Sequence, residues 1–407
     1  MQWDQVFATR TSRMKASEIR ELLKLLEQPD IISFAGGIPD PALFPTGAFE
    51  NAISETLRSD DGNAALQYSV SEGYLPLREW IAGEMGRLGV PCDPGNILIT
   101  SGSQQALDYL GKLLLSPNDT ALVSLPTYLG ALGAFNAYEP NYQPLVPEAN
   151  KPAAQYRDAA AAAGGRVKFA YMSVDFANPT GRTLNRAARA AMIELADDLD
   201  IAIIEDAAYQ TLRYDGEVIP PILALEVAGK GSIENARTIY CGTFSKTLAP
   251  GLRLGWVCAA KPVISQLVLI KQAADLHTPT LNQMAVSRVA RQIFDDHVAT
   301  LRNTYRTRRD AMLAALEREM PPGVEWTRPE GGMFIWLTLP QEMNGSDLLA
   351  RSLETHRVAF VPGGAFFADG SGQNTLRLSF SLADQTMIDE GIRRLGRLLA
   401  DARQPVT

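Results

Sequence analysis

Residues 242–255 read GTFSKTLAPGLRLG and place a lysine among small, hydroxylated and apolar residues. Lys246 follows the apolar run TIYCGTF (238–244), and Arg253 comes seven positions after it. A lysine whose pKa is lowered by burial or by nearby cations can act as a nucleophile toward an aldehyde. The segment therefore predicts a reactive lysine. The alternative, a solvated lysine in a loop, explains neither the arginine nor the apolar flanks.

The sequence around this segment predicts the fold class. Short apolar runs alternate with helical patterns and lie at 96–100, 120–126, 166–174, 200–208 and 237–244. Such runs, separated by helices, are typical of a mostly parallel sheet that is covered on both faces. We therefore expect an α/β architecture.

The pattern changes after about residue 280, where a long charged helical stretch leads into GGMFIWLTL, RVAFVPGGAFF and TLRLSFS. These shorter runs are compatible with a smaller α+β unit. Residues 152–165 (PAAQYRDAAAAAGG) predict a surface helix that ends at glycine. A length of 407 residues suggests roughly two or three domains.

Composition argues against several classes of protein. A net charge of −8 disfavours a nucleic-acid-binding surface, and no apolar run approaches the ~20 residues that cross a bilayer. The first residues lack the apolar core of a signal peptide. Three cysteines and three histidines are too scattered for a disulfide framework or a metal site. We expect a cytoplasmic protein without a metal, a nucleic-acid partner or a membrane span.

Three further segments carry polar residues at the ends of predicted strands. In TSGSQQALD (100–108), Gly102 permits a tight turn, and the first helical turn, with Ser103 and Gln104, offers amides to an anion. A plain serine cap is the alternative there.

The other two segments follow later strands. In FANPTGRTL (176–184), the following proline biases Asn178 toward an extended conformation, although a simple turn would explain the segment equally well. In IIEDAAYQTL (203–212), Asp206 needs a cationic partner if it is buried, and Tyr209 follows it. An exposed strand end is the alternative for Asp206.

Together the segments supply a lysine for an aldehyde, a carboxylate for a ring cation, and hydroxyl and guanidinium donors for a phosphate. Pyridoxal 5′-phosphate requires all three, because it bonds a lysine, needs an acidic partner at its ring nitrogen and carries a phosphate. The combination therefore predicts this cofactor.

Longer motifs point to one family. They are ISFAGGIPDPALFP (32–45), LQYSVSEGYLPLREW (66–80), ITSGSQQALD (99–108), HTPTLNQM (277–284), RPEGGMFIWL (328–337) and the VPGGAFFADG and NTLRLSFS segments. Over almost its whole length the sequence resembles the fold-type-I, class I and II pyridoxal-phosphate aminotransferases, and most of all their 2-aminoadipate and kynurenine aminotransferase branch. The resemblance implies a large domain with a mostly parallel seven-stranded sheet (41–285), a smaller α+β domain (286–407) and an N-terminal arm (1–40) that joins the small domain.

The resemblance also implies roles for single residues. Lys246 is the Schiff-base lysine and the proton-transfer base, and Asp206 pairs with the pyridine nitrogen. The other implied cofactor contacts are Tyr209 and Asn178 at the ring oxygen, Tyr128 stacked on the ring, and Ser103, Gln104, Ser245 and Arg253 at the phosphate. Tyr68 is expected to reach the phosphate in a neighbouring subunit, which implies a homodimer.

On the substrate side, the resemblance implies that Arg377 clamps the α-carboxylate, helped by Asn178 and the Gly37 backbone. Arg20 lies where this branch places a mobile arginine for a distal carboxylate; an ordinary exposed helix cation is the alternative. We therefore expect 2-aminoadipate or glutamate as donor and 2-oxoglutarate as acceptor, in a ping-pong cycle. Aromatic or aliphatic donors would bind if Arg20 moved away.

Two positions depart from the family pattern: Ala177 replaces a usual glutamine, and Thr243 replaces a frequent serine. Two alternatives remain open. A lyase or decarboxylase on the same fold would use the same lysine, aspartate and arginine. A ligand-sensing domain of a transcriptional regulator is disfavoured by the acidic composition.

Overall fold

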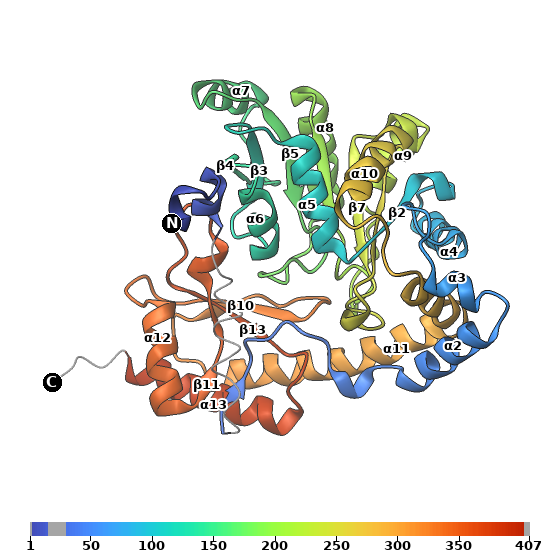
Figure 1. Ribbon diagram of the computed structural model, residues 1–407. Coiled ribbons are helices and arrows are strands. Elements are labelled where there is room, and N and C mark those ends of the chain that lie inside the picture. The colour runs from blue at the N-terminus through green and yellow to red at the C-terminus, as the bar shows by residue number, and fades with distance from the viewer. Residues whose placement is uncertain (1, 15–29, 403–407) are drawn as a thin grey trace.

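The computed structural model describes residues 2–14 and 30–402 (Figure 1). Arg20, a predicted substrate contact, lies outside the described residues. The strands are β1 (Ile32–Ser33), β2 (Ile97–Thr100), β3 (Thr120–Ser124), β4 (Asn141–Leu145), β5 (Val167–Met172), β6 (Ala202–Asp206), β7 (Thr238–Thr243), β8 (Gly255–Cys258), β9 (Glu325–Trp326), β10 (Phe334–Thr338), β11 (Val358–Ala359), β12 (Val361–Pro362) and β13 (Thr375–Ser379).

The α-helices are α2 (Thr46–Arg58), α3 (Gly62–Leu66), α4 (Leu75–Arg87), α5 (Ser103–Leu114), α6 (Leu129–Asn136), α7 (Ala153–Ala162), α8 (Arg186–Leu199), α9 (Ile222–Lys230), α10 (Lys261–Ala274), α11 (Thr280–Glu319), α12 (Gly345–Arg351) and α13 (Gln385–Asp401). None of these described helices combines the length and apolar character that a membrane span needs.

The largest sheet has seven strands, ordered β2-β8-β7-β6-β5-β3-β4. Its strands run parallel except β8, which is antiparallel to both of its neighbours. Each of the five predicted apolar runs contains one of these strands, and the expected α/β fold with a mostly parallel sheet is confirmed. The short strands β4 and β8 were not predicted.

Helices cover both faces of this sheet (Figure 1). Along β5, Phe169 and Tyr171 point to one face, where α5, α6 and α10 pack. Ala170 and Met172 point to the other face, where α7 and α8 pack. Alternation along a strand divides its side chains between two faces. Because both faces are buried, these strands are apolar at nearly every position.

The C-terminal residues build a second, four-stranded antiparallel sheet ordered β12-β13-β10-β9. It shares a hydrophobic core with α13 and the C-terminal half of α11. Strand β1 pairs in parallel with β11, so residues 32–33 join this C-terminal part. The predicted boundary at 285–286 falls inside α11, the long helix that runs beneath both parts in Figure 1. The division into domains remains a prediction.

Candidate active site

The predicted site residues gather where the parallel strands of the large sheet end. Asp206 is the last residue of β6, and Lys246 follows the end of β7. The turn that opens α5 follows β2, which points the same way because both β2 and β7 are antiparallel to β8. Ligand sites of open α/β sheets lie at this carboxyl edge.

Asp206 is a buried carboxylate with one oxygen occupied. The Tyr171 hydroxyl donates to its Oδ2 at 2.8 Å. Its Oδ1 is buried and has no hydrogen-bond partner in the described part of the chain. Burial raises the pKa of Asp206, and the Tyr171 hydrogen bond opposes that rise. An unpaired buried carboxylate oxygen costs free energy unless a donor, best a cationic one, meets it.

Lys246 faces the N-terminal segment across the site. Its Nζ donates to the Gly37 carbonyl at 3.0 Å and lies 5.8 Å from the centre of the Tyr209 ring. Part of the residue is open to solvent. Burial of its amine, together with the nearby charges of Arg377 and Arg253, nevertheless lowers the pKa of Lys246 to about 8. A substantial share of this amine is therefore neutral near pH 8 and able to react.

The turn before α5 forms an anion cradle. Gly102 has a φ of +85°, and a Cβ there would collide with the Arg253 guanidinium. A Cβ on Gly255 would lie 2.7 Å from the Ser103 amide. No side chain caps the helix start, so its first amides remain available. Together with the guanidinium, the helix N-terminus offers a phosphate several donors.

Ser245 lies beside this cradle. The Thr243 hydroxyl donates to Ser245 Oγ at 3.0 Å and accepts from the Ser245 amide at 3.1 Å. Thr243 thus fixes the start of the lysine turn, so the departure from serine keeps its hydroxyl contact. The Gln104 side chain is held by a hydrogen bond in which its Nε2 donates to the Gly130 carbonyl at 2.6 Å.

Arg377 is a buried cation on β13, with an exposed fraction of 2%. Its guanidinium donates to Asn178 Oδ1 at 2.7 Å and to the Ala35 carbonyl at 2.8 Å. It lies 4.4 Å from the centre of the Phe334 ring and 5.1 Å from that of Phe366.

Within the described residues, no carboxylate forms an ion pair with Arg377, and its buried Nε has no partner. Burial lowers the pKa of Arg377 to about 10, so the group stays cationic at neutral pH. A buried guanidinium without an anion is suited to a carboxylate ligand.

Three predicted tyrosines remain, and their surroundings differ. Tyr209 is buried beside Asn178, edge-on to Phe334 with ring centres 5.5 Å apart. Tyr128 precedes α6 and lies against Gly130. Tyr68 instead is 79% exposed, with its ring edge-on to that of His277 at 6.1 Å.

Sequence reasoning missed several residues that hold the site. Tyr171 is one, because the alternation of β5 marks it only as a core residue. Lys271 and Asp275 are others. Gln105 Oε1 accepts from the Ser101 amide at 2.8 Å and from Lys271 Nζ at 2.9 Å, and Asp275 accepts from Gln105 Nε2 at 2.8 Å. This network supports the turn before α5, and no local sequence motif indicates it.

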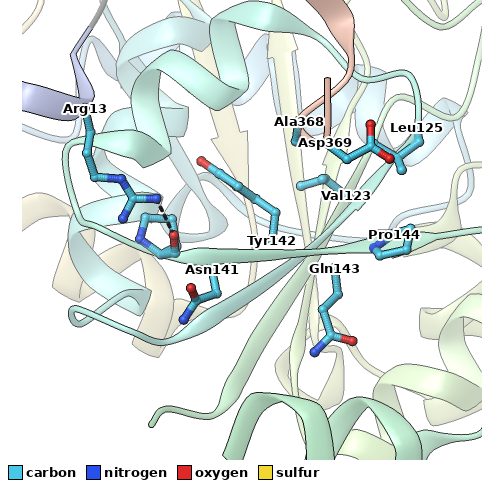
Figure 2. Close-up of a pocket in the computed structure, with 10 residues that line it drawn as sticks. Arg13, Val123, Leu125, Asn141, Tyr142, Gln143, Pro144, Ala368 and Asp369 are labelled. Atoms are coloured by element: carbon cyan, nitrogen blue, oxygen red, sulfur yellow. Dashed lines mark hydrogen bonds between the residues drawn. The ribbon is translucent and has the colours of Figure 1, made fainter. Parts of the chain in front are cut away.

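A pocket of about 260 Å³ lies elsewhere, at the edge strand β4 (Figure 2). Arg13, from the turn Thr9–Arg13, donates to the Pro140 carbonyl at its rim at 2.6 Å. None of its lining residues is a predicted site residue, so it does not enter the argument on function.

The residues at the carboxyl edge fit pyridoxal phosphate. The orphaned Asp206 oxygen suits a protonated ring nitrogen, the amine of Lys246 suits an aldehyde, and the cradle at Gly102 suits a phosphate. No group of three or more metal-binding side chains is found in residues 2–14 and 30–402.

Comparison with known proteins gives a consistent result. The family model "Aminotransferase class I and II" matches residues 30–395. A 2-aminoadipate transaminase of Thermus thermophilus is 42% identical over 98% of both chains. An alpha-aminoadipate aminotransferase structure from that species, complexed with N-(5′-phosphopyridoxyl)-L-leucine, shares 40% identity and a TM-score of 0.87, covering 98% of this chain and 99% of that one. A Pyrococcus horikoshii kynurenine aminotransferase structure with PMP has 42% identity, a TM-score of 0.91 and 99% coverage of both.

Proposed function

Because this chain belongs to the class I and II aminotransferases and is a pyridoxal-phosphate-dependent transaminase, we propose that its donors are 2-aminoadipate and glutamate and its acceptor is 2-oxoglutarate. The active unit in this proposal is a homodimer. The site residues act as the family resemblance implies, and the protein works in the cytoplasm.

The observation that carries the proposed substrate class is the buried Arg377 without an anionic partner in the described chain. A guanidinium can hold a carboxylate through two parallel hydrogen bonds. Two of its nitrogens are already oriented by Asn178 and by the Ala35 carbonyl, so little side-chain entropy is lost when a substrate binds. Amino acids and 2-oxo acids share this carboxylate, which lets one arginine serve both half-reactions.

Lys246 and Asp206 supply the proton chemistry. When bound, pyridoxal phosphate supplies an aldehyde for the amino group and a cationic ring that withdraws electrons from the α-carbon. Asp206, through its unoccupied Oδ1, would hold the proton on the ring nitrogen. Lys246, with a pKa of about 8, would take the proton from the substrate α-carbon. The buried ring of Tyr209 lies beside Lys246, and the buried rings of Phe334 and Phe366 lie beside Arg377, so these cations have apolar surroundings.

The proposal of an acidic donor is based on Arg20 and on the relatives. The Thermus thermophilus relative is named for 2-aminoadipate, whereas the solved structures carry a leucine adduct or act on kynurenine. We therefore propose that Arg20 binds the distal carboxylate of acidic donors and moves aside for apolar ones.

A half-reaction screen tests this proposal. Single amino acids are added to the cofactor-loaded protein without an oxo acid, and conversion of the cofactor to its amine form is followed by absorption. We expect 2-aminoadipate and glutamate to react fastest. Arg20→Ala should slow the acidic donors far more than leucine or phenylalanine, whereas Arg58→Ala, at the exposed end of α2, should change neither class.

Three other outcomes would correct the proposal in different ways. Faster reaction with aromatic or aliphatic donors would overturn the donor class and keep the transaminase. Equal losses for both classes in Arg20→Ala would remove the role of Arg20. Release of ammonia or carbon dioxide without the amine form of the cofactor would instead identify a lyase or a decarboxylase.

A further inference from the structure

Two of the three cysteines lie next to each other, although 166 residues separate them in the chain. Cys258 ends β8, and Cys92 lies in the loop after α4; their sulfur atoms are 4.0 Å apart. The third cysteine, Cys241, lies on β7 and is fully buried. The separation of Cys92 and Cys258 along the chain does not indicate a pair.

The backbone on both sides of the two cysteines is fastened together. Cys258 pairs with Ile97 in the sheet, and the next residues, Asn96 and Ala259, exchange hydrogen bonds of 3.0 and 3.1 Å. These contacts therefore hold the loop that carries Cys92 against the end of β8. A disulfide needs a sulfur–sulfur distance of about 2.0 Å, so the two side chains must rotate toward each other to form the bond.

An ion pair next to the two cysteines also holds the loop in place. Asp93 Oδ2 accepts from Lys261 Nζ at 2.7 Å. Cys92 also lies between Pro91 and Pro94, whose rings restrict the loop. The contact between the sulfurs therefore belongs to a loop that is fixed at both ends, which distinguishes it from a chance approach of two mobile side chains.

The two thiols differ in a way that suits stepwise exchange. Cys92 is half-buried, whereas Cys258 is fully buried, so Cys92 is the more exposed of the two. The Cys258 thiol donates to Cys92, which lowers the pKa of Cys92 and raises that of Cys258. The thiolate is the attacking species in exchange, so Cys92 is the group that reacts first.

We propose that Cys92 and Cys258 form a reversible intramolecular disulfide by exchange with a small disulfide such as oxidised glutathione. The Cys92 thiolate attacks one glutathione sulfur and releases the first glutathione thiolate. Cys258 then loses its proton and attacks Cys92 Sγ, which releases the second. The two cysteines are oxidised, one glutathione disulfide is reduced to two thiols, and the two protons pass to the leaving glutathiones.

This bridge would join the loop after α4 to the end of β8 that lies away from the cofactor site. Gly255, at the opposite end of β8, is the residue that approaches the Ser103 amide. The proposal is thus independent of the substrate assignment, and cofactor binding should not depend on it.

The test uses the cofactor-loaded protein and oxidised glutathione. We expect the intact chain to lose the mass of two hydrogen atoms and two of its three titratable thiols, and peptide mapping to link Cys92 to Cys258. Reduction by dithiothreitol should restore all three thiols. Cys241 should remain free throughout and serves as an internal control.

Single variants separate the two steps. Cys258→Ser should stop at a stable glutathione adduct on Cys92, and Cys92→Ser should react with no glutathione at all; Cys258→Ala repeats the first test should serine not be tolerated in the core. The proposal is overturned by a wild-type protein that keeps three thiols, that stops at the glutathione adduct, or that bridges Cys241.

Discussion

At the scale of single residues, the Tyr171 hydroxyl determines how Asp206 can bind a cofactor. It occupies Oδ2 and leaves Oδ1 as the oxygen of Asp206 that has no hydrogen-bond partner in the described chain. The hydrogen bond also stabilises the charged form of Asp206 against burial. A carboxylate that stays ionised keeps the proton on a ring nitrogen, so Tyr171 is a positioning residue that acts through Asp206.

Tyr171→Phe should therefore weaken cofactor binding. A hydrogen bond to a charged group contributes about 1.5–3 kcal/mol, so we expect the affinity of the cofactor-free protein for pyridoxal phosphate to fall at least about tenfold. The absorption of the bound cofactor should also change its pH dependence, which a structural defect alone would not cause.

Tyr156→Phe is the matched control, because that tyrosine is equally buried and donates to the Pro144 carbonyl at 3.1 Å, away from Asp206. It should leave both readouts unchanged. Equal losses in the two variants would show that Tyr171 contributes only to stability.

The pKa of Lys246 gives a second prediction at this scale. Burial lowers it from the usual lysine value to about 8, so the amine is mostly charged below pH 8 and mostly neutral above it. The rate at which the cofactor-free protein bonds pyridoxal phosphate should rise about tenfold from pH 7 to pH 9 and then level off. Absorption after rapid mixing measures this rate.

Arg377→Met should move the midpoint of that rise to higher pH, because the Arg377 charge is the largest electrostatic cause of the lowered pKa. Arg328→Met removes an exposed cation and should leave the midpoint in place. A flat profile between pH 7 and pH 9 would contradict the lowered pKa of Lys246.

At the scale of elements, the fully buried strands were predictable and the unusual ones were not. The runs that contain β5, β6 and β7 are apolar at nearly every position because helices cover both faces. Strand β4 reads NYQPL at the edge of the sheet, where one side needs no apolar residues and proline is tolerated. Strand β8 is four residues long and begins at Gly255, where the lysine segment ends, so only Trp256, Val257 and Cys258 remain to indicate a strand.

The network behind α5 gives a prediction at the same scale. Lys271 is fully buried and pairs with Asp275 at 2.9 Å, four residues on, while it also holds Gln105. Lys271→Met would leave the turn before α5 without this support. We expect the affinity for pyridoxal phosphate to fall roughly tenfold, because breaking a buried pair is costly. The affinity for pyridoxal, which lacks the phosphate, should change little.

Lys230→Met is the control for this prediction. Lys230 also pairs with an acidic residue four positions away, Glu226, at 2.8 Å, but it lies at the end of α9 outside the site. It should leave both affinities unchanged. Equal losses for pyridoxal and pyridoxal phosphate in Lys271→Met would mean that the network supports the fold and not the phosphate cradle.

At the scale of the whole molecule, the site is assembled from distant parts of the chain. Arg377 donates to Asn178, 199 residues away, and to Ala35, 342 residues away. The types of residue and their local settings predicted the cofactor, because each motif stands at a strand end. That these motifs come together in one site could be expected only from the family resemblance, because no local sequence pattern shows which segments are in contact.

Tyr68 extends this argument beyond one chain. It is 79% exposed, and the neighbouring Leu66 and Val70 are 73% and 56% exposed. A contiguous set of exposed apolar residues often marks an interface. If Tyr68 serves the cofactor of a second subunit, as we propose, each active site combines Lys246 of one chain with Tyr68 of the other.

Mixing two inactive variants tests this directly. Tyr68→Ala keeps the lysine, and Lys246→Ala keeps the tyrosine. After unfolding and refolding together, half of the dimers should be mixed, and each mixed dimer has one site with both residues intact. Activity should then recover to about a quarter of the wild-type value, because a symmetric dimer has two equivalent sites. If Tyr68 acted within its own chain, no mixed dimer would contain an intact site, and activity would not exceed that of Tyr68→Ala alone.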